Sequence, residues 1–146
     1  MKINGWTILF HPLFNDQWQQ LLDLVKSLRS RLPQKDFVQH PQVKLFKALT
    51  VGIEEKIPTD PLASYFALRK PLDKYSRLKK MGLPSRYRLF FKVFPQQKVL
   101  IILWLGFPRK EGDKKDCYRV FTKMVKKGQF PLSLKDLIDS DNGKKS

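Results

Sequence analysis

Apolar residues recur at helical spacing in two stretches of the first half of the chain. This spacing predicts helices over residues 12–32 and 41–57. Pro12 and Pro41 each suit the first turn of a helix, and Pro33 ends the first of the two. The apolar stripes of these helices provide most of the hydrophobic surface that a sheet could bury against.

The second half changes to the shorter period of strands. Strands are predicted near residues 75–80, 85–94 and 98–107, and an opening strand near 3–10. The last three strands have connections too short for crossovers, so they should form an antiparallel meander. The run near 98–107 is almost wholly apolar, which is typical of a strand covered on both sides. A final helix is predicted over 114–127.

This order of elements indicates an α+β fold, with an antiparallel twisted sheet and helices packed on one face. Residues 1–138 should form a single domain, and the polar residues 139–146 a frayed tail. Side chains alternate along the strand near 85–94, so one face should be apolar and the other basic. The apolar set is Tyr87, Leu89, Phe91 and Val93, and the other set is Arg86, Arg88, Phe90 and Lys92.

The charge of the chain is concentrated in its second half. The net charge is +16; residues 1–60 carry 8 Lys/Arg and 6 Asp/Glu, whereas residues 61–146 carry 21 and 7. A region this cationic repels itself unless an anionic partner binds it. Nucleic acid, an acidic protein, or both in turn are therefore the expected partners.

Other classes of protein are disfavoured by composition. No apolar run approaches the roughly 20 residues needed to span a bilayer, and the N-terminus does not resemble a signal peptide. Cys117 is the single cysteine, which excludes an internal disulfide and a cysteine-based metal site and fits a cytoplasmic protein. No glycine-rich phosphate loop is present, so no nucleotide cofactor is expected.

Basic and aromatic residues from four segments should converge on the polar face of the sheet. They are Arg77, Lys79, Arg86, Arg88, Lys92, Arg109, Lys115, Tyr118 and Arg119. Cations beside aromatic rings suit single-stranded nucleic acid, although a solvated face of a half-buried strand is the simpler interpretation of the strand alone. His11 and His40 each precede a proline, which favours capping over catalysis, and Cys117 falls on the apolar stripe of its helix.

The ordered motifs resemble those of RelE-type bacterial toxins, and most closely the YhaV subgroup. The resemblance rests on Arg77-Leu78-Lys79, on the run Arg86 to Phe91, and on Tyr118 to Met124, with Asn4-Gly5-Trp6 and His11-Pro12 near the start. It implies an mRNA endoribonuclease, active on translating ribosomes and silenced by an antitoxin that looks like a PrlF-type swapped-hairpin DNA-binding protein. The implied reaction is attack of a ribose 2′-OH on the adjacent phosphate, without metal or cofactor.

The resemblance also implies roles for individual residues. The basic pair of the family falls on Arg77 and Lys79, its strand arginine on Arg88, and its helix tyrosine on Tyr118. A downstream arginine falls on Arg109 or, less directly, on Lys115. The implied catalytic residues are thus Lys79, Arg88, Arg109 and Tyr118, and the implied RNA-binding residues are Arg77, Arg86, Lys92, Lys115 and Arg119.

Arg77 departs from the lysine of the broader family. An always-charged guanidinium is a poor proton acceptor, so a general-base role shifts to Lys79 or Tyr118. Two other functions remain open on the sequence alone: a non-catalytic RNA- or ribosome-binding module, and a scaffold that only binds an antitoxin. Formation of new 5′-OH ends on mRNA would distinguish an enzyme from both.

Overall fold

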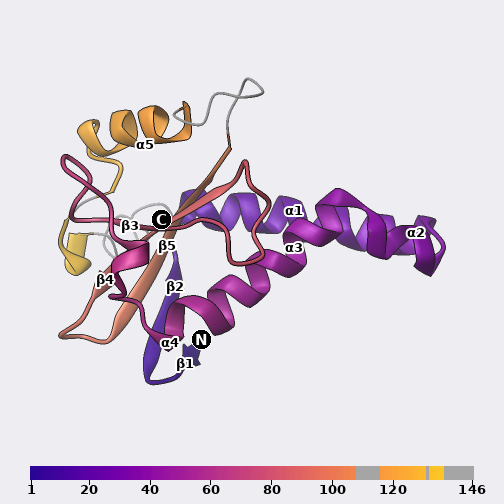
Figure 1. The fold of residues 1–146 in the computed structure, drawn as a ribbon, viewed down its shortest axis with the longest axis horizontal. Helices are drawn as coiled ribbons and strands as arrows, with labels where there is room; N and C mark the ends of the chain where they lie inside the picture. Colours follow the sequence, from indigo (N-terminus) through magenta and orange to yellow (C-terminus); the bar gives the residue numbers. More distant parts are fainter. Residues whose placement is uncertain (108–115, 131, 137–146) are drawn as a thin grey trace, which may run out of the picture.

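A five-stranded sheet lies at the centre of the protein, as the computed structural model shows (Figure 1). The structure describes residues 1–107, 116–130 and 132–136. The strand order across the sheet is β1-β2-β5-β4-β3. The strands are β1 (Lys2–Ile3), β2 (Trp6–Phe10), β3 (Ser76–Leu78), β4 (Arg88–Phe94) and β5 (Val99–Gly106). The α+β class is therefore confirmed.

The antiparallel meander of β3, β4 and β5 is confirmed, but the N-terminal region differs from prediction. The predicted strand near 3–10 is a hairpin, because Asn4 and Gly5 adopt positive φ angles of 52° and 82° and turn the chain between β1 and β2. β2 then pairs parallel to β5, which corrects the expectation of a wholly antiparallel sheet. No short turn joins β2 to β5, because helices, loops and two strands lie between them in the chain. The direction of β2 relative to β5 is therefore not fixed by a turn.

Helices α1 (Pro12–Arg31) and α3 (Pro41–Val51) from the first half cover one face of the sheet. The short helix α2 (Gln34–Gln39) connects them, and the π-helical turn η1 (Gly52–Lys56) and α4 (Ile57–Thr59) follow α3. The helix predicted over 12–32 is confirmed, and the one predicted over 41–57 corresponds to α3, η1 and α4. The short helix α2 was not expected, and a single 3-10 turn, η2 (Ser64–Phe66), lies in the following loop.

Both histidines cap helices, as predicted. The Nδ1 atom of His11 accepts a hydrogen bond from the Leu13 amide at 3.2 Å, at the start of α1. The Nδ1 atom of His40 accepts from the Gln42 amide at 3.1 Å, at the start of α3. Each ring thus satisfies a backbone N–H that has no partner within the helix.

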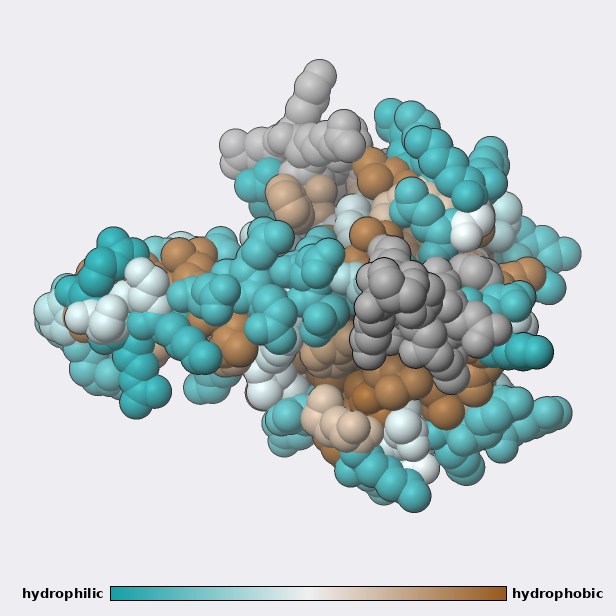
Figure 2. All heavy atoms as spheres, turned by 180° about the vertical axis from the view of Figure 1, so that it is seen from behind, coloured by the Kyte–Doolittle hydropathy of each residue, from teal (hydrophilic) through white to brown (hydrophobic). Residues whose placement is uncertain are grey.

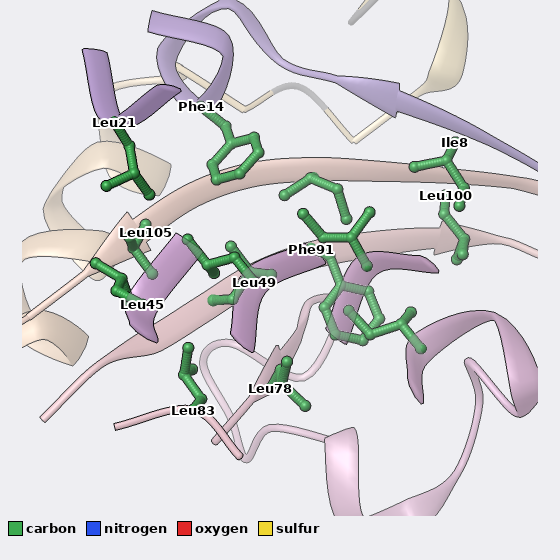
Figure 3. Close-up of a cluster of buried hydrophobic side chains, with 14 of the residues drawn as sticks. Ile8, Phe14, Leu21, Leu45, Leu49, Leu78, Leu83, Phe91, Leu100 and Leu105 are labelled. Carbon is green, nitrogen blue, oxygen red and sulfur yellow. The ribbon is translucent and has the colours of Figure 1, made fainter. Parts of the chain in front are cut away.

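The larger hydrophobic cluster joins these helices to the sheet (Figure 3). Phe14 and Leu21 of α1 and Leu45 and Leu49 of α3 point toward the strands, where Phe91 of β4 meets them. The predicted apolar set of β4 faces this cluster, with Leu89 and Phe91 fully buried and Tyr87 and Val93 packed at its border.

The opposite face of the sheet is also covered by a helix, which corrects the prediction that helices pack on one face only. Helix α5 (Asp116–Lys126) lies there, on the other side of the sheet from α1 and α3 (Figure 1). Phe121 of α5 stacks on Phe90 of β4, with ring centroids 4.1 Å apart. Phe90 is apolar and was placed among the basic residues; burying it requires a cover, which Phe121 and Cys117 provide.

A register shift in the β4–β5 ladder lets β5 contribute to both clusters. Phe90 pairs with Trp104, but Phe91 pairs with Ile102, so Leu103 is the extra residue of a bulge. Leu103 and Trp104 therefore both lie on the α5 side, while Ile102 and Leu105 face α1 and α3. The prediction that this strand is covered on both sides is confirmed.

The helices α1, α2 and α3 extend away from the sheet as an arm with α2 at its tip (Figure 1). From behind, most of the surface of this arm is hydrophilic, with separate hydrophobic patches (Figure 2). None of the helices that the structure describes is long and apolar enough to cross a membrane.

Candidate active site on the α5 side of the sheet

Three of the predicted site residues meet at a single hydroxyl group. The Nε atoms of Arg77 on β3 and Arg88 on β4 each donate a hydrogen bond of 3.0 Å to the hydroxyl oxygen of Tyr118 on α5. The three residues are far apart in the sequence but come from neighbouring strands and from the helix packed over them. The predicted convergence is thus observed for Arg77, Arg88 and Tyr118.

Backbone carbonyls fix both guanidinium groups in place. Nη1 of Arg88 donates to the carbonyls of Ser85 and Tyr87 at 2.7 and 2.8 Å. Nη1 of Arg77 donates to the carbonyl of Tyr65 at 3.2 Å. No described residue accepts a hydrogen bond from Nη2 of either arginine. Each guanidinium is therefore oriented by its protein partners and retains donors for an anion.

Aromatic packing sets the position of Tyr118. Its ring meets Phe90 edge-on, with centroids 5.7 Å apart and an interplanar angle of 86°. Gly106 at the end of β5 allows α5 to approach closely, because a Cβ atom there would lie 2.6 Å from the Trp104 ring and 2.9 Å from Cβ of Cys117. The rigid sheet and its stacked rings thus hold the hydroxyl at a defined place.

The hydroxyl of Tyr118 is limited by these contacts to one kind of proton transfer. Its oxygen already accepts two N–H donors, from Arg77 and Arg88. What the group can still offer is its own proton, since a phenol has a single O–H donor. In this arrangement Tyr118 is suited to give a proton rather than to take one.

A basic groove begins at Tyr118 and follows the outer side of α5. The hollow has a volume of about 810 Å³. We use the term basic groove for its lining residues, which are Arg69, Lys79, Tyr118, Arg119, Thr122, Lys123 and Lys126. Lys79 and Arg119, both predicted site residues, therefore share one hollow with Tyr118. Lys79 is half-buried and Arg119 is exposed.

Lys92 does not belong to this surface, which corrects its prediction as an RNA contact. Its side chain is only 8% exposed, its Nζ donates to the Lys74 carbonyl at 2.7 Å, and it lies 4.9 Å from the centre of the Tyr75 ring. Burial, assisted by the charge of Lys74, lowers the pKa of Lys92 below the ordinary 10.5. Alternation along β4 placed Lys92 on the correct face, but the neighbouring loop covers that end of the strand.

The other predicted site residues are Arg86, Arg109 and Lys115. Arg86 is exposed and precedes β4, so strand alternation does not reach it. Arg109 and Lys115 lie outside the described residues. Among the described residues, no group of three His, Cys, Asp or Glu side chains could hold a metal ion. Cys117, on the apolar side of α5, is buried, as predicted.

Comparison with known proteins places the chain in a family. Residues 8–142 match the model of a family described as a toxin with endonuclease activity, of a toxin–antitoxin system, named for the toxin YhaV. The chain belongs to the YhaV toxin family. It is 33% identical over 144 residues to the ribonuclease toxin YhaV of Escherichia coli K12, an alignment that covers 93% of this chain and 92% of that protein.

Solved structures of RelE toxins align with the chain at lower similarity. A mutant of Escherichia coli RelE in the free state has 12% identity and a TM-score of 0.46, over 79% of this chain and 96% of the other. The RelBE2 toxin–antitoxin complex of Mycobacterium tuberculosis has 14% identity and a TM-score of 0.44, over 70% and 98%. Membership of the YhaV family confirms the predicted toxin class and endonuclease activity through the family model itself.

Sequence reasoning missed part of the groove in this YhaV-family toxin. Lys123 and Lys126 line the groove but were not among the predicted site residues. The signal that could have included them is their spacing on one side of a helix, since residue 126 follows 118 and 122 at intervals of four and residue 123 follows 119 at the same interval. Arg69 and the carbonyl of Tyr65 carried no such signal, because they belong to an irregular proline-rich loop.

Proposed function

We propose that this YhaV-family toxin is a metal-independent endoribonuclease that cleaves mRNA through the ribose 2′-OH. The observation that carries the proposal is the pair of arginines fixed on the Tyr118 hydroxyl at the start of the basic groove. Phosphoryl transfer requires neutralisation of charge that develops on phosphate oxygens, and preorganised guanidinium groups provide it. The 2′-OH requirement makes RNA the substrate and excludes DNA.

The reaction assigns a role to each residue of the cluster. The 2′-oxygen attacks the adjacent phosphorus and loses its proton to a base, for which Lys79 is the candidate in the groove. Arg77 and Arg88 bind the phosphate oxygens as negative charge grows on them. The bond from phosphorus to the 5′-oxygen breaks, and Tyr118 donates its proton to that oxygen. The products are a 2′,3′-cyclic phosphate and a 5′-OH end.

Tyr118 is assigned as the acid because its oxygen already accepts two hydrogen bonds. This leaves Lys79 rather than Tyr118 as the candidate base, whereas the sequence alone left both open. Arg109 remains a candidate for a further phosphate contact, and Arg86, Arg119 and Lys115 for contacts with the RNA beyond the cleaved bond.

The substrate is proposed to be mRNA on the ribosome, and the partner an antitoxin. A net charge of +16 favours binding to a ribosomal RNA surface and, equally, to an acidic protein that would neutralise the toxin. We propose a PrlF-like antitoxin of the swapped-hairpin DNA-binding type, encoded beside the toxin. Co-expression of the neighbouring reading frame should restore growth; continued growth arrest would exclude that protein as the antitoxin.

Induction of the lone chain in cells, followed by mapping of transcript 5′ ends, tests the activity. Wild type should produce new 5′-OH ends within coding regions, and Arg88→Ala should reduce them about 10²-fold or more, as expected when one charge stabiliser is removed. Equal growth arrest by Arg88→Ala and wild type would exclude the assignment. Messages that lack a start codon should be spared if cleavage requires translation.

Purified protein tests the chemistry directly. An RNA oligonucleotide with a single 2′-deoxy nucleotide at the cleavage position should resist cleavage there, while the all-ribose oligonucleotide is cut. Cleavage of both would rule out attack by the 2′-oxygen. Binding without any cleavage would favour the non-catalytic RNA-binding module, and harmless expression of the chain alone would favour the antitoxin-binding scaffold.

A further inference from the structure

The basic groove contains three cationic side chains to which the proposed reaction assigns no role. Lys123 and Lys126 are exposed and line the basic groove beyond Tyr118, and Arg69 lines it from a different segment. None of these three side chains forms a hydrogen bond or ion pair with a described residue. Thr122 is in contrast occupied, because its Oγ1 donates to the Tyr118 carbonyl at 2.7 Å.

The groove is longer than a single phosphate. Tyr118 and Lys126 are eight residues apart on one helix, which corresponds to about 12 Å along the axis. Lysines near a helix C-terminus also stabilise the helix through its dipole, and this would be a purely structural reason for Lys123 and Lys126. The dipole does not account for Arg69, which belongs to another segment and faces the same hollow.

The lining favours a polyanion over a protein segment. Five of the seven groove residues are Lys or Arg, the other two carry hydroxyl groups, and none is aliphatic. Protein partners bind mainly through apolar anchors in desolvated pockets, which this groove does not offer. A single-stranded backbone needs spaced cations, because each neutralised phosphate releases counterions.

We propose that Lys123, Lys126 and Arg69 form a track for RNA phosphates that lie beyond the cleaved bond and hold the substrate across the active site. This inference rests on the proposed endoribonuclease function and extends it. Because the track contacts nucleotides away from the reacting atoms, it should lower KM for long RNA and leave kcat unchanged. It should contribute nothing to an RNA too short to reach it.

The test uses the full-length toxin, a Lys123→Gln/Lys126→Gln variant and a Lys44→Gln/Lys47→Gln control. Lys44 and Lys47 are exposed on α3, so the control removes the same charge from a different helix. Cleavage of a 12-nucleotide RNA and of a trinucleotide is measured for all three proteins. Fluorescence anisotropy of the labelled 12-nucleotide RNA is measured at several salt concentrations.

For the 12-nucleotide RNA, the track variant should raise KM about tenfold and keep kcat within about twofold of wild type. Its salt dependence of binding should weaken by about 1.4 in the slope of log K against log salt, as expected for two single-strand phosphate contacts. The trinucleotide should show no change of KM. Arg69→Gln alone should produce roughly half of the slope change.

Three results would overturn the track. The first is an equal loss in the Lys44/Lys47 control, which would reflect net charge alone. The second is an unchanged KM and salt slope in the track variant. The third is unchanged RNA affinity with weakened binding of a polyglutamate peptide, which would assign the surface to an acidic protein. If wild type cleaves no RNA, the proposed function fails, and the binding slopes still decide whether the track exists.

Discussion

Two hollows on opposite faces of the sheet differ almost completely in chemistry. The basic groove is lined by Lys, Arg and hydroxyl groups. The second hollow, the apolar groove, has a volume of about 560 Å³ and lies where α1 and α3 meet the end of β5. Its lining residues are Phe14, Gln17, Trp18, Gln20, Leu21, Leu24, Gln42, Leu45, Leu49, Tyr87, Leu105 and Phe107.

Neighbouring residues of the chain serve the two hollows. Tyr87 lines the apolar groove, while Arg88 binds Tyr118 at the start of the basic groove. The chain thus passes from an apolar to a cationic environment within one residue, where β4 begins. The comparison teaches that the hollow on the α5 side of the sheet is cationic, whereas the hollow on the α1–α3 side is not.

The two grooves also satisfy their polar groups differently. In the apolar groove, the Gln17 amide donates to the Leu105 carbonyl and accepts from the Leu105 amide, both at 2.8 Å. Gln17 thereby replaces the neighbouring strand where β2 has ended and β5 continues. In the basic groove, by contrast, Arg69, Lys123 and Lys126 have no described protein partner. Polar groups in the first groove are bound to the protein backbone, whereas these cations of the second are hydrogen-bonded to no described residue.

Among substitutions that test the difference between the two grooves, the largest expected effect is on catalysis. Tyr118→Phe removes the proton donor and should lower kcat about 10²- to 10⁴-fold, with KM within a few fold of wild type. Tyr87→Phe removes the same hydroxyl from the apolar groove and should leave kcat unchanged. Single-turnover cleavage of an RNA oligonucleotide measures both; similar losses in the two variants would contradict the assignment of Tyr118.

Gln17→Ala should have the largest effect on stability. It leaves two backbone groups of Leu105 without a partner in a partly buried place, at a cost of about 2–4 kcal/mol. Urea unfolding measures the free energy. Gln20→Ala is the matched control, because Gln20 lines the same groove but forms no hydrogen bond with a described residue. Equal destabilisation by both variants would show that Gln17 does not replace a strand.

Gly106→Ala should affect the basic groove and spare the apolar one. The new Cβ would lie 2.6 Å from the Trp104 ring and 2.9 Å from Cβ of Cys117, so α5 must move, at a cost of about 1–3 kcal/mol. Activity should fall with stability, because Tyr118 moves with α5. Adding Trp104→Phe to the Gly106→Ala variant should restore part of the lost activity and part of the lost stability. Full activity of Gly106→Ala alone would show that the close approach of α5 to β5 is unimportant.

The smallest effect is expected for Lys92→Met. Lys92 is buried, so the substitution should leave the salt dependence of RNA binding unchanged and alter stability at pH 7 by less than about 1 kcal/mol. A change of the salt slope equal to that of a groove lysine would return Lys92 to the RNA-binding surface.

The pH dependence of Lys92 provides a second measurement. Burial lowers its pKa in the folded protein, so the folded state binds fewer protons than the unfolded state between the lowered value and 10.5. The unfolding free energy of wild type should therefore rise relative to Lys92→Met as pH increases through that window. Tyr75, whose pKa is raised by burial, is present in both proteins, so its contribution cancels. A difference that is independent of pH would contradict the burial of a charged amine.

Local sequence was sufficient for most of the elements, though not for α2 or the β1–β2 hairpin, and for one face of the sheet. Helical spacing and prolines located α1 and α3, short connections required the meander, and alternation along β4 separated Leu89 and Phe91 from Arg88. These features are encoded within a few residues of one another, by side-chain direction and turn length. The ordered motifs also sufficed to predict the toxin family.

Tertiary structure alone decided what lies over the second face. Whether a strand lysine meets solvent, as predicted for Lys92, depends on which distant segment packs across it, and no local period encodes that. The parallel direction of β2, the cover that α5 forms over Phe90, and the meeting of Arg77, Arg88 and Tyr118 depend likewise on long-range packing. The sequence determined which side chains were available, and burial of apolar surface from distant segments determined which of them came together.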